Sequence, residues 1–115
     1  MTARIYHNNR CSKSRATLAL LEARGVTCEV INYLETPPSI DELTGLLDML
    51  GMTPRELMRK GEPEYAELGL DNPSLDDTAL IAAMASHPRL IERPILVANG
   101  KAAIGRPPEA VLSIL

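Results

Sequence analysis

Residues 4–33 read RIYHNNRCSKSRATLALLEARGVTCEVINY, and the order of elements that this stretch predicts decides the fold. Residues 4–7 predict a short strand, and residues 12–24 have the spacing of apolar and polar residues typical of an amphipathic helix. Gly25 suits the left-handed cap at the end of that helix, and residues 28–33 are rich in strand-forming residues. Two strands joined by a helix predict a parallel pair with a right-handed crossover.

The middle of the chain predicts helices only. Ser39 with Glu42, and Thr53 with Glu56, have the spacing of a capping box at a helix start. The expected helices cover about residues 39–50, a short segment from residue 54, residues 64–68 and residues 76–86. Together they predict an all-helical insert over about residues 39–86.

The last part of the chain predicts a hairpin and a final helix. Two apolar runs, residues 95–98 and 101–104, flank Asn99-Gly100, which is the strongest short signal for a hairpin turn. Prolines then precede an amphipathic helix over residues 109–115. The complete order is β-α-β, helical insert, β-β-α. This order predicts an α/β protein with a thioredoxin-like fold and a mixed four-stranded sheet, in one domain over residues 1–115.

The composition excludes several classes of protein. The chain has 115 residues, 45% apolar and 23% charged, which is ordinary for a folded globular protein with one core. It has a net charge of −3, no Phe or Trp, and no basic tract, so we expect no nucleic-acid partner. No apolar run approaches the roughly 20 residues of a membrane-spanning helix, and no signal peptide is evident. We therefore expect a cytoplasmic protein without a membrane partner.

Cys11 is the candidate nucleophile. It directly precedes the first helix, where unpaired backbone N–H groups and the helix dipole favour an anion such as a thiolate or a bound oxyanion. An unperturbed thiol, with a pKa of about 8.5, is only slightly ionised at neutral pH, so a catalytic cysteine needs this help. Because its neighbours are polar, we expect Cys11 to be exposed. The residues near it that could tune the thiolate are His7, Ser12 and Arg15.

The second cysteine and the histidines suggest no further chemistry. Cys28 lies among strand-forming apolar residues without basic neighbours, so we interpret it as a packing residue. Two cysteines and two histidines without metal-ligand spacing predict no metal site. Cys11 and Ser14 form a Cys-x-x-Ser motif, and serine cannot resolve a mixed disulfide as a second cysteine would. An oxidised Cys11 therefore needs an external thiol.

Four motifs carry a resemblance to a known family: IYHNNRCSKSR, LMRKGEPEYAELGL, ERPI at residues 92–95 and GRPPE at residues 105–109. In this order, and over essentially the whole chain, they closely resemble the glutaredoxin-linked arsenate reductases of the ArsC type. The resemblance implies a thioredoxin-like fold with Cys11 as the nucleophile. The residues that it implies for binding the oxyanion and the thiolate are Arg59, Arg93, Arg106 and Ser14. The fold also implies that Pro94, before the third strand, follows a cis peptide bond.

The resemblance also implies a reaction. Cys11 attacks arsenate, glutathione releases arsenite and leaves a Cys11–glutathione disulfide, and glutaredoxin restores the thiol. The partners are then arsenate, glutathione as co-substrate and glutaredoxin, with no bound cofactor. In one departure from the family pattern, Asn9 replaces a proline, and we expect this to loosen the loop before Cys11.

Two alternatives share the fold. The first is a general glutathione-dependent thiol-disulfide oxidoreductase, which would turn over without an oxyanion. The second is a non-enzymatic regulator resembling the Spx proteins, which bind RNA polymerase. Spx proteins usually have a Cys-x-x-Cys switch, and Ser14 disfavours that interpretation.

Overall fold

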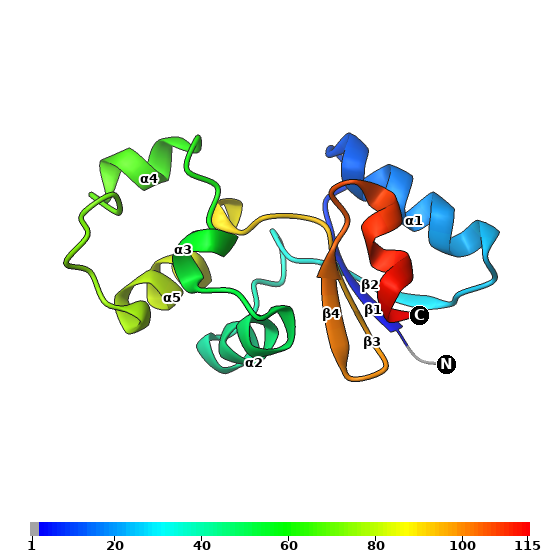
Figure 1. Cartoon of the computed structure of the whole chain (residues 1–115). Helices are drawn as coiled ribbons and strands as arrows, with labels where there is room; N and C mark the ends of the chain where they lie inside the picture. The colour runs from blue at the N-terminus through cyan, green and yellow to red at the C-terminus, as the bar shows by residue number, and fades with distance from the viewer. Residues whose placement is uncertain (1–2) are drawn as a thin grey trace. The chain divides into compact units, whose positions relative to one another are not determined.

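The computed structural model describes residues 3–115, which divide into two compact units (Figure 1). The first unit contains the chain through Thr36 together with Arg93–Leu115, and the second unit contains Pro37–Glu92. Within the described part of the chain, each helix is too short or too polar to span a membrane.

A four-stranded mixed sheet in the order β2-β1-β3-β4 forms the centre of the first unit. Strand β1 (Ala3–His7) pairs in parallel with β2 (Cys28–Asn32) and antiparallel with β3 (Ile95–Ala98), which pairs antiparallel with β4 (Lys101–Ile104). Helix α1 (Ser12–Ala23) connects β1 to β2. The predicted mixed sheet and its parallel crossover are confirmed.

One face of this sheet is covered by α1 and by η2 (Pro108–Ile114), which pack on each other (Figure 1). The core between them contains buried residues from β1, α1, β3 and η2, namely Ala3, Ile5, Leu21, Leu96, Ala98, Val111 and Ile114. Apolar burial of this kind is the main stabilising contribution in a small domain. It also anchors α1, whose N-cap residue is Cys11, to the sheet.

The turn between β3 and β4 has the backbone conformation expected for Asn-Gly. Asn99 and Gly100 have φ values of 55° and 72°, which are the positive values that a two-residue type I′ turn requires. The predicted final helix differs in type, because η2 is a 3₁₀ helix. Its first bond has the i→i−3 pattern of a 3₁₀ helix, because the N–H of Ala110 donates to the carbonyl of Pro107 (2.9 Å).

The second unit contains the predicted helices. They are α2 (Ile40–Leu50), α3 (Pro54–Leu57), α4 (Pro63–Glu67), α5 (Asp77–Ser86) and the 3₁₀ helix η1 (Pro88–Leu90). The capping box of Thr53 and Glu56 is complete, and the Ser39 hydroxyl accepts from the backbone N–H of Glu42. Besides these helices, the second unit contains an isolated antiparallel bridge between Met58 and Ile91.

Candidate active site

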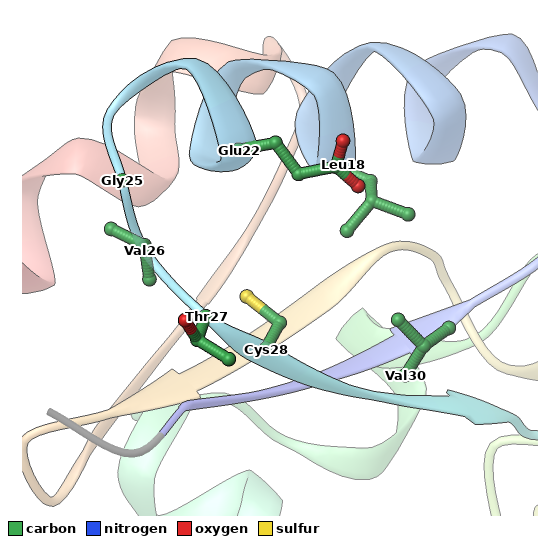
Figure 2. Close-up of a pocket in the computed structure, with 7 residues that line it drawn as sticks. All are labelled: Leu18, Glu22, Gly25, Val26, Thr27, Cys28 and Val30. Atoms are coloured by element: carbon green, nitrogen blue, oxygen red, sulfur yellow. The ribbon is translucent and has the colours of Figure 1, made fainter.

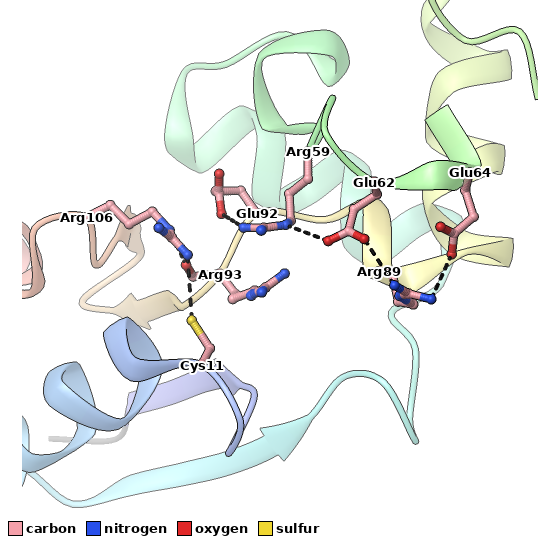
Figure 3. Close-up of polar contacts among 8 residues, drawn as sticks. All are labelled: Cys11, Arg59, Glu62, Glu64, Arg89, Glu92, Arg93 and Arg106. Atoms are coloured by element: carbon pink, nitrogen blue, oxygen red, sulfur yellow. Dashed lines mark hydrogen bonds and ion pairs between the residues drawn. The ribbon is translucent and has the colours of Figure 1, made fainter. Parts of the chain in front are cut away.

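Cys11 is the N-cap residue of α1. Its backbone is extended (φ −93°, ψ 121°), its N–H donates to the carbonyl of Asn8 (3.0 Å), and its carbonyl accepts from Arg15 N–H (3.0 Å). Only 8% of its surface is exposed, so the expectation of an exposed cysteine is wrong. The polar neighbours that suggested exposure surround the backbone, while the side chain is turned against Arg93 and Arg106 (Figure 3).

The surroundings of the thiol favour its ionised form. Burial opposes ionisation and on its own raises the pKa of Cys11, but hydrogen-bond donors outweigh it. The backbone N–H and the hydroxyl of Ser14 and the side chain of Arg93 lower the pKa, with a smaller contribution from the backbone N–H of Lys13. The net result is a pKa of about 7 for Cys11. The thiolate is therefore far more populated at neutral pH than in an unperturbed cysteine.

Two arginines on either side of the β3–β4 hairpin meet at the sulfur. Nη2 of Arg106 donates to the Cys11 Sγ at 3.6 Å, and Nε of Arg106 donates to the carbonyl of Arg93 at 2.8 Å (Figure 3). Both arginines precede a cis peptide bond, Arg93–Pro94 and Arg106–Pro107. The cis bond expected at Pro94 is therefore present, whereas sequence reasoning missed the one at Pro107. A guanidinium carries a permanent charge and a planar set of donors, which suits both a thiolate and an oxyanion.

Gly105 allows the loop before Arg106 to approach α1. Its N–H donates to the carbonyl of Pro94 (2.9 Å), and a Cβ at this position would overlap the Thr17 Oγ1 and lie 2.8 Å from the Pro94 Cγ. Thr17 is fully buried, and its hydroxyl donates to the carbonyl of Lys13 (2.7 Å). Sequence reasoning did not select Gly105 or Thr17. Their signal was present as a glycine directly before Arg-Pro and a polar residue on the buried side of a helix.

The loop before Cys11 is held in place by Asn9. The Asn9 Oδ1 lies 2.6 Å from the His7 Nε2, and the Asn9 carbonyl accepts from the Arg15 Nη1 (2.8 Å). The expectation that Asn9 loosens this loop stays a prediction beside these two contacts. An asparagine side chain supplies an acceptor that proline lacks, and here it binds the last residue of β1.

The other candidate residues of the first unit have diverse surroundings. Ser14 is fully buried, and its hydroxyl accepts from the N–H of Asn8 (3.4 Å). His7 is also buried (3% exposed) and Ser12 is exposed. None of His7, Ser12 and Arg15 is among the groups that shift the pKa of Cys11 within the described chain. Arg15 instead supports the Asn9 carbonyl.

Arg59 belongs to the second unit, where two carboxylates bind it. Its Nη1 lies 2.8 Å from the Glu92 Oε1 and its Nε lies 3.3 Å from the Glu62 Oε1 (Figure 3). Glu62 also pairs with Arg89 (3.2 Å), which extends the network to Glu64 (3.8 Å). The guanidinium predicted to bind an oxyanion is thus half-buried in an ion-pair network.

Cys28 has the opposite character to Cys11. It packs beside the core of the first unit and lines a shallow groove with α1 residues such as Leu18 and Glu22 (Figure 2). Burial, and to a lesser degree the Glu22 carboxylate, raise the pKa of Cys28. Its thiol is therefore a poor nucleophile. Among residues 3–115, no group of three or more His, Cys, Asp or Glu side chains is arranged to hold a metal ion.

Comparison with known proteins places this site in a family. Residues 6–114 match the model of the ArsC family. The chain belongs to the ArsC family. Among its ArsC-family relatives, an arsenate reductase of Neisseria meningitidis is 55% identical over 97% of both chains. The uncharacterized protein YfgD of Escherichia coli K12 is 59% identical over 97% of this chain and 95% of its own length.

A solved structure extends the similarity to three dimensions. The arsenate reductase from Vibrio cholerae matches with a TM-score of 0.98 and 58% sequence identity, covering 100% of this chain and 98% of that one. The thioredoxin-like α/β fold expected from the order of elements is therefore the ArsC-family fold.

Proposed function

We propose that this ArsC-family protein is an arsenate reductase that uses glutathione and glutaredoxin in the cytoplasm. The observation that carries the proposal is a buried cysteine with a pKa of about 7 whose sulfur faces two guanidinium groups. A thiolate supplies the nucleophile and the arginines supply an anion-binding surface. Relatives named arsenate reductase at 55% and 58% identity support the choice of arsenate among oxyanions.

The first step forms a sulfur–arsenic bond. The Cys11 thiolate attacks the arsenic of H₂AsO₄⁻, and one arsenate hydroxyl takes up a proton from solvent and leaves as water, so that a Cys11–S–AsO₃H⁻ adduct remains. Arg93 and Arg106 offset the negative charge that the nucleophile and substrate bring together. Arg59 is proposed as a third guanidinium for the oxyanion. Because Glu62 and Glu92 bind it in this structure, arsenate has to compete with two carboxylates for its donors.

The second step transfers two electrons to arsenic. A glutathione thiol attacks the Cys11 Sγ, the sulfur–arsenic bond breaks with its electron pair on arsenic, and the thiol proton leaves with arsenite as H₂AsO₃⁻. Arsenic is reduced from the +5 to the +3 state while the two sulfurs are oxidised to a disulfide. A glutaredoxin thiol then attacks the glutathione sulfur, takes the glutathione as its own mixed disulfide and frees Cys11. This last step requires an external thiol, because Ser14 cannot form the disulfide that a second cysteine would.

The test is arsenate-dependent NADPH oxidation in a coupled assay with glutathione, glutaredoxin and glutathione reductase. We expect turnover with the wild type and with Cys28→Ser, and background rates with Cys11→Ser. Cys28→Ser is the matched control because it removes a thiol with a raised pKa from the same unit. Equal rates for wild type and Cys11→Ser would reject the proposal.

The alternative function, a general glutathione-dependent thiol-disulfide oxidoreductase, predicts a different result in the same coupled assay. A glutathionylated peptide substrate would then replace arsenate, and turnover would occur without any oxyanion. Activity on the peptide without activity on arsenate would favour this alternative over arsenate reduction. Recovery of RNA polymerase subunits with the protein, and no turnover in either assay, would favour the Spx-like regulator.

A further inference from the structure

A polar groove lies beside the loop that carries Cys11. Its volume is about 250 Å³, and its lining comes from the loop after β1 and the turn after β2, namely Asn8, Asn9, Arg10, Asn32, Leu34 and Glu35. The two strands pair in parallel with His7 opposite Asn32, so their carboxyl ends open to the same edge of the sheet. Ligands of open α/β sheets bind at this kind of edge.

The groove offers one unused charge of each sign. Arg10 and Glu35 are both exposed, and neither side chain has an ion pair or hydrogen bond with any residue of the described chain. Arg10 differs in this respect from Arg15, whose side chain donates to the Asn9 carbonyl, and from Arg106, whose side chain donates to Cys11 and to the Arg93 carbonyl. A free guanidinium and a free carboxylate in one groove are complementary to a ligand end with both charges.

The asparagines of the groove add neutral donors. The Oδ1 of Asn8 accepts from the N–H of Arg10 (2.9 Å), and the Oδ1 of Asn9 lies 2.6 Å from the His7 Nε2. With the carboxamide oxygens used in this way, the two NH₂ groups remain as donors for carbonyl or carboxylate oxygens. The groove therefore combines the charges of an amino-acid head group with donors suited to a peptide.

We propose that this groove binds the γ-glutamyl end of glutathione, with the α-carboxylate on Arg10, the α-ammonium on Glu35 and the asparagine amides on the neighbouring carbonyl groups. The inference rests on the proposed function, which makes glutathione the co-substrate at Cys11. A groove of about 250 Å³ lies just below the roughly 300–1,000 Å³ of pockets that hold drug-sized ligands, so it accommodates one end of the tripeptide.

The groove adjoins Cys11 along the chain. Arg10, one of its lining residues, directly precedes Cys11, so the two Cα atoms are about 3.8 Å apart. A glutathione held at its γ-glutamyl end beside Arg10 would therefore carry its thiol close to the loop of Cys11. Anchoring the charged end converts the attack on the Cys11 sulfur into a reaction between held partners, which raises its effective rate. The groove would thereby favour glutathione over small thiols that lack a γ-glutamyl group.

The direct test measures the affinity for S-methylglutathione, whose blocked thiol cannot react. Isothermal titration calorimetry or changes in NMR chemical shifts give this affinity. We expect Arg10→Ala and Glu35→Ala each to weaken binding at least fivefold. Arg24→Ala and Glu29→Ala are matched controls, because they remove exposed side chains of the same types outside the groove, and we expect unchanged affinity. Absence of binding to the wild type, or an affinity of both groove variants equal to that of the wild type, would overturn the inference.

A truncated ligand tests which end of glutathione occupies the groove. We expect S-methylcysteinylglycine, which lacks the γ-glutamyl group, to bind more weakly and with no dependence on Arg10. Equal sensitivity of this dipeptide to Arg10→Ala would overturn the assignment of the γ-glutamyl end.

The two proposals fail separately. If the groove variants weaken the binding of S-methylglutathione but the protein does not turn over arsenate, the proposed arsenate reductase function is rejected and the proposed glutathione site is retained. If both groove variants turn over arsenate with an unchanged KM for glutathione, the proposed function is retained and the proposed glutathione site is rejected.

Discussion

At the scale of single residues, the reactivity of Cys11 results from competition between burial and hydrogen bonding. A thiol with 8% exposure would ordinarily resist ionisation, yet donors from Ser14, Arg93 and Lys13 bring its pKa to about 7. The nucleophile is therefore shielded from water and ionised at the same time. Single substitutions around it test each contribution.

Arg93→Met retains an unbranched apolar stem and removes the charge and the hydrogen-bond donors of the side chain. Because the Arg93 side chain helps to lower the pKa of Cys11, we expect this variant to raise that pKa above about 7, as measured by the pH dependence of Cys11 alkylation. Arg24→Met, at the opposite end of α1, is the matched control. An unchanged alkylation profile in Arg93→Met would show that Arg93 does not stabilise the thiolate.

Ser14→Ala removes a hydroxyl that stabilises the thiolate but keeps the backbone N–H, which lowers the pKa more. We therefore expect a smaller rise in the pKa of Cys11 than a loss of the helix N–H groups would cause, together with slower alkylation at pH 7. Measuring the alkylation rate of Ser14→Ala across pH, with Cys28→Ser in the background, checks this. Alkylation at pH 7 as fast as in the parent protein would contradict the assigned role.

At the scale of elements, the site depends on the close approach of the loop after β4 to α1. Gly105 lies against Thr17 and Pro94, and the next residue contacts the sulfur. The position of Arg106 is therefore coupled to the packing of the glycine that precedes it.

Gly105→Ala places a Cβ in contact with Thr17 and Pro94, and neither can move freely because both are buried. We expect a loss of about 1–3 kcal/mol in the free energy of unfolding, together with a raised pKa of Cys11. Gly45→Ala is the contrasting control, since its Cβ meets open space in α2 and should stabilise the protein by up to about 1 kcal/mol. Chemical denaturation measures both, and equal stabilities for the two variants would refute the packing argument.

The ion-pair network of the second unit predicts a modest effect on stability. Glu92→Gln weakens one of the two carboxylate contacts of Arg59, and both side chains of that pair are about one quarter exposed. We expect a loss of no more than about 1 kcal/mol in the free energy of unfolding, which salt should reduce. Comparing urea unfolding of the variant at low and high salt tests this, and a loss that grows with salt would contradict it.

At the scale of the whole molecule, ionisation of Cys11 links the stability of the fold to pH. A pKa lowered to about 7 in the folded state, against about 8.5 in the unfolded chain, adds stability that is complete above about pH 8.5 and lost as the pH falls through 7. We expect the stability of the wild type relative to Cys11→Ser to rise between pH 7 and 8.5. A flat difference across this range would contradict the lowered pKa.

Local signals made most of the fold predictable. The Thr53 capping box, the Asn99-Gly100 turn and the glycine cap at Gly25 are encoded within a few residues, and each is present in the structure. The 3₁₀ character of η2 was not predicted. Proline at the start of a helix is compatible with both the α and the 3₁₀ geometry, so the sequence signal does not separate them.

Long-range contacts limited the prediction of the site. The nucleophile and its arginines were selected from motifs, but the direction of the Cys11 side chain involves a contact with Arg106, which is 95 residues away in the sequence. The role of Asn9 was missed for a similar reason, since its bond to His7 depends on how the loop turns back toward β1. Composition around a residue predicts the exposure of the backbone better than the direction of one side chain.

The measurement that tests the central claim most directly is the rate of Cys11 alkylation against pH, with and without arsenate, in a Cys28→Ser background. We predict a midpoint near pH 7 and slower alkylation as arsenate is added, because a thiolate beside Arg93 and Arg106 forms part of an anion site. A midpoint near the unperturbed value of about 8.5, with no effect of arsenate, would contradict the account.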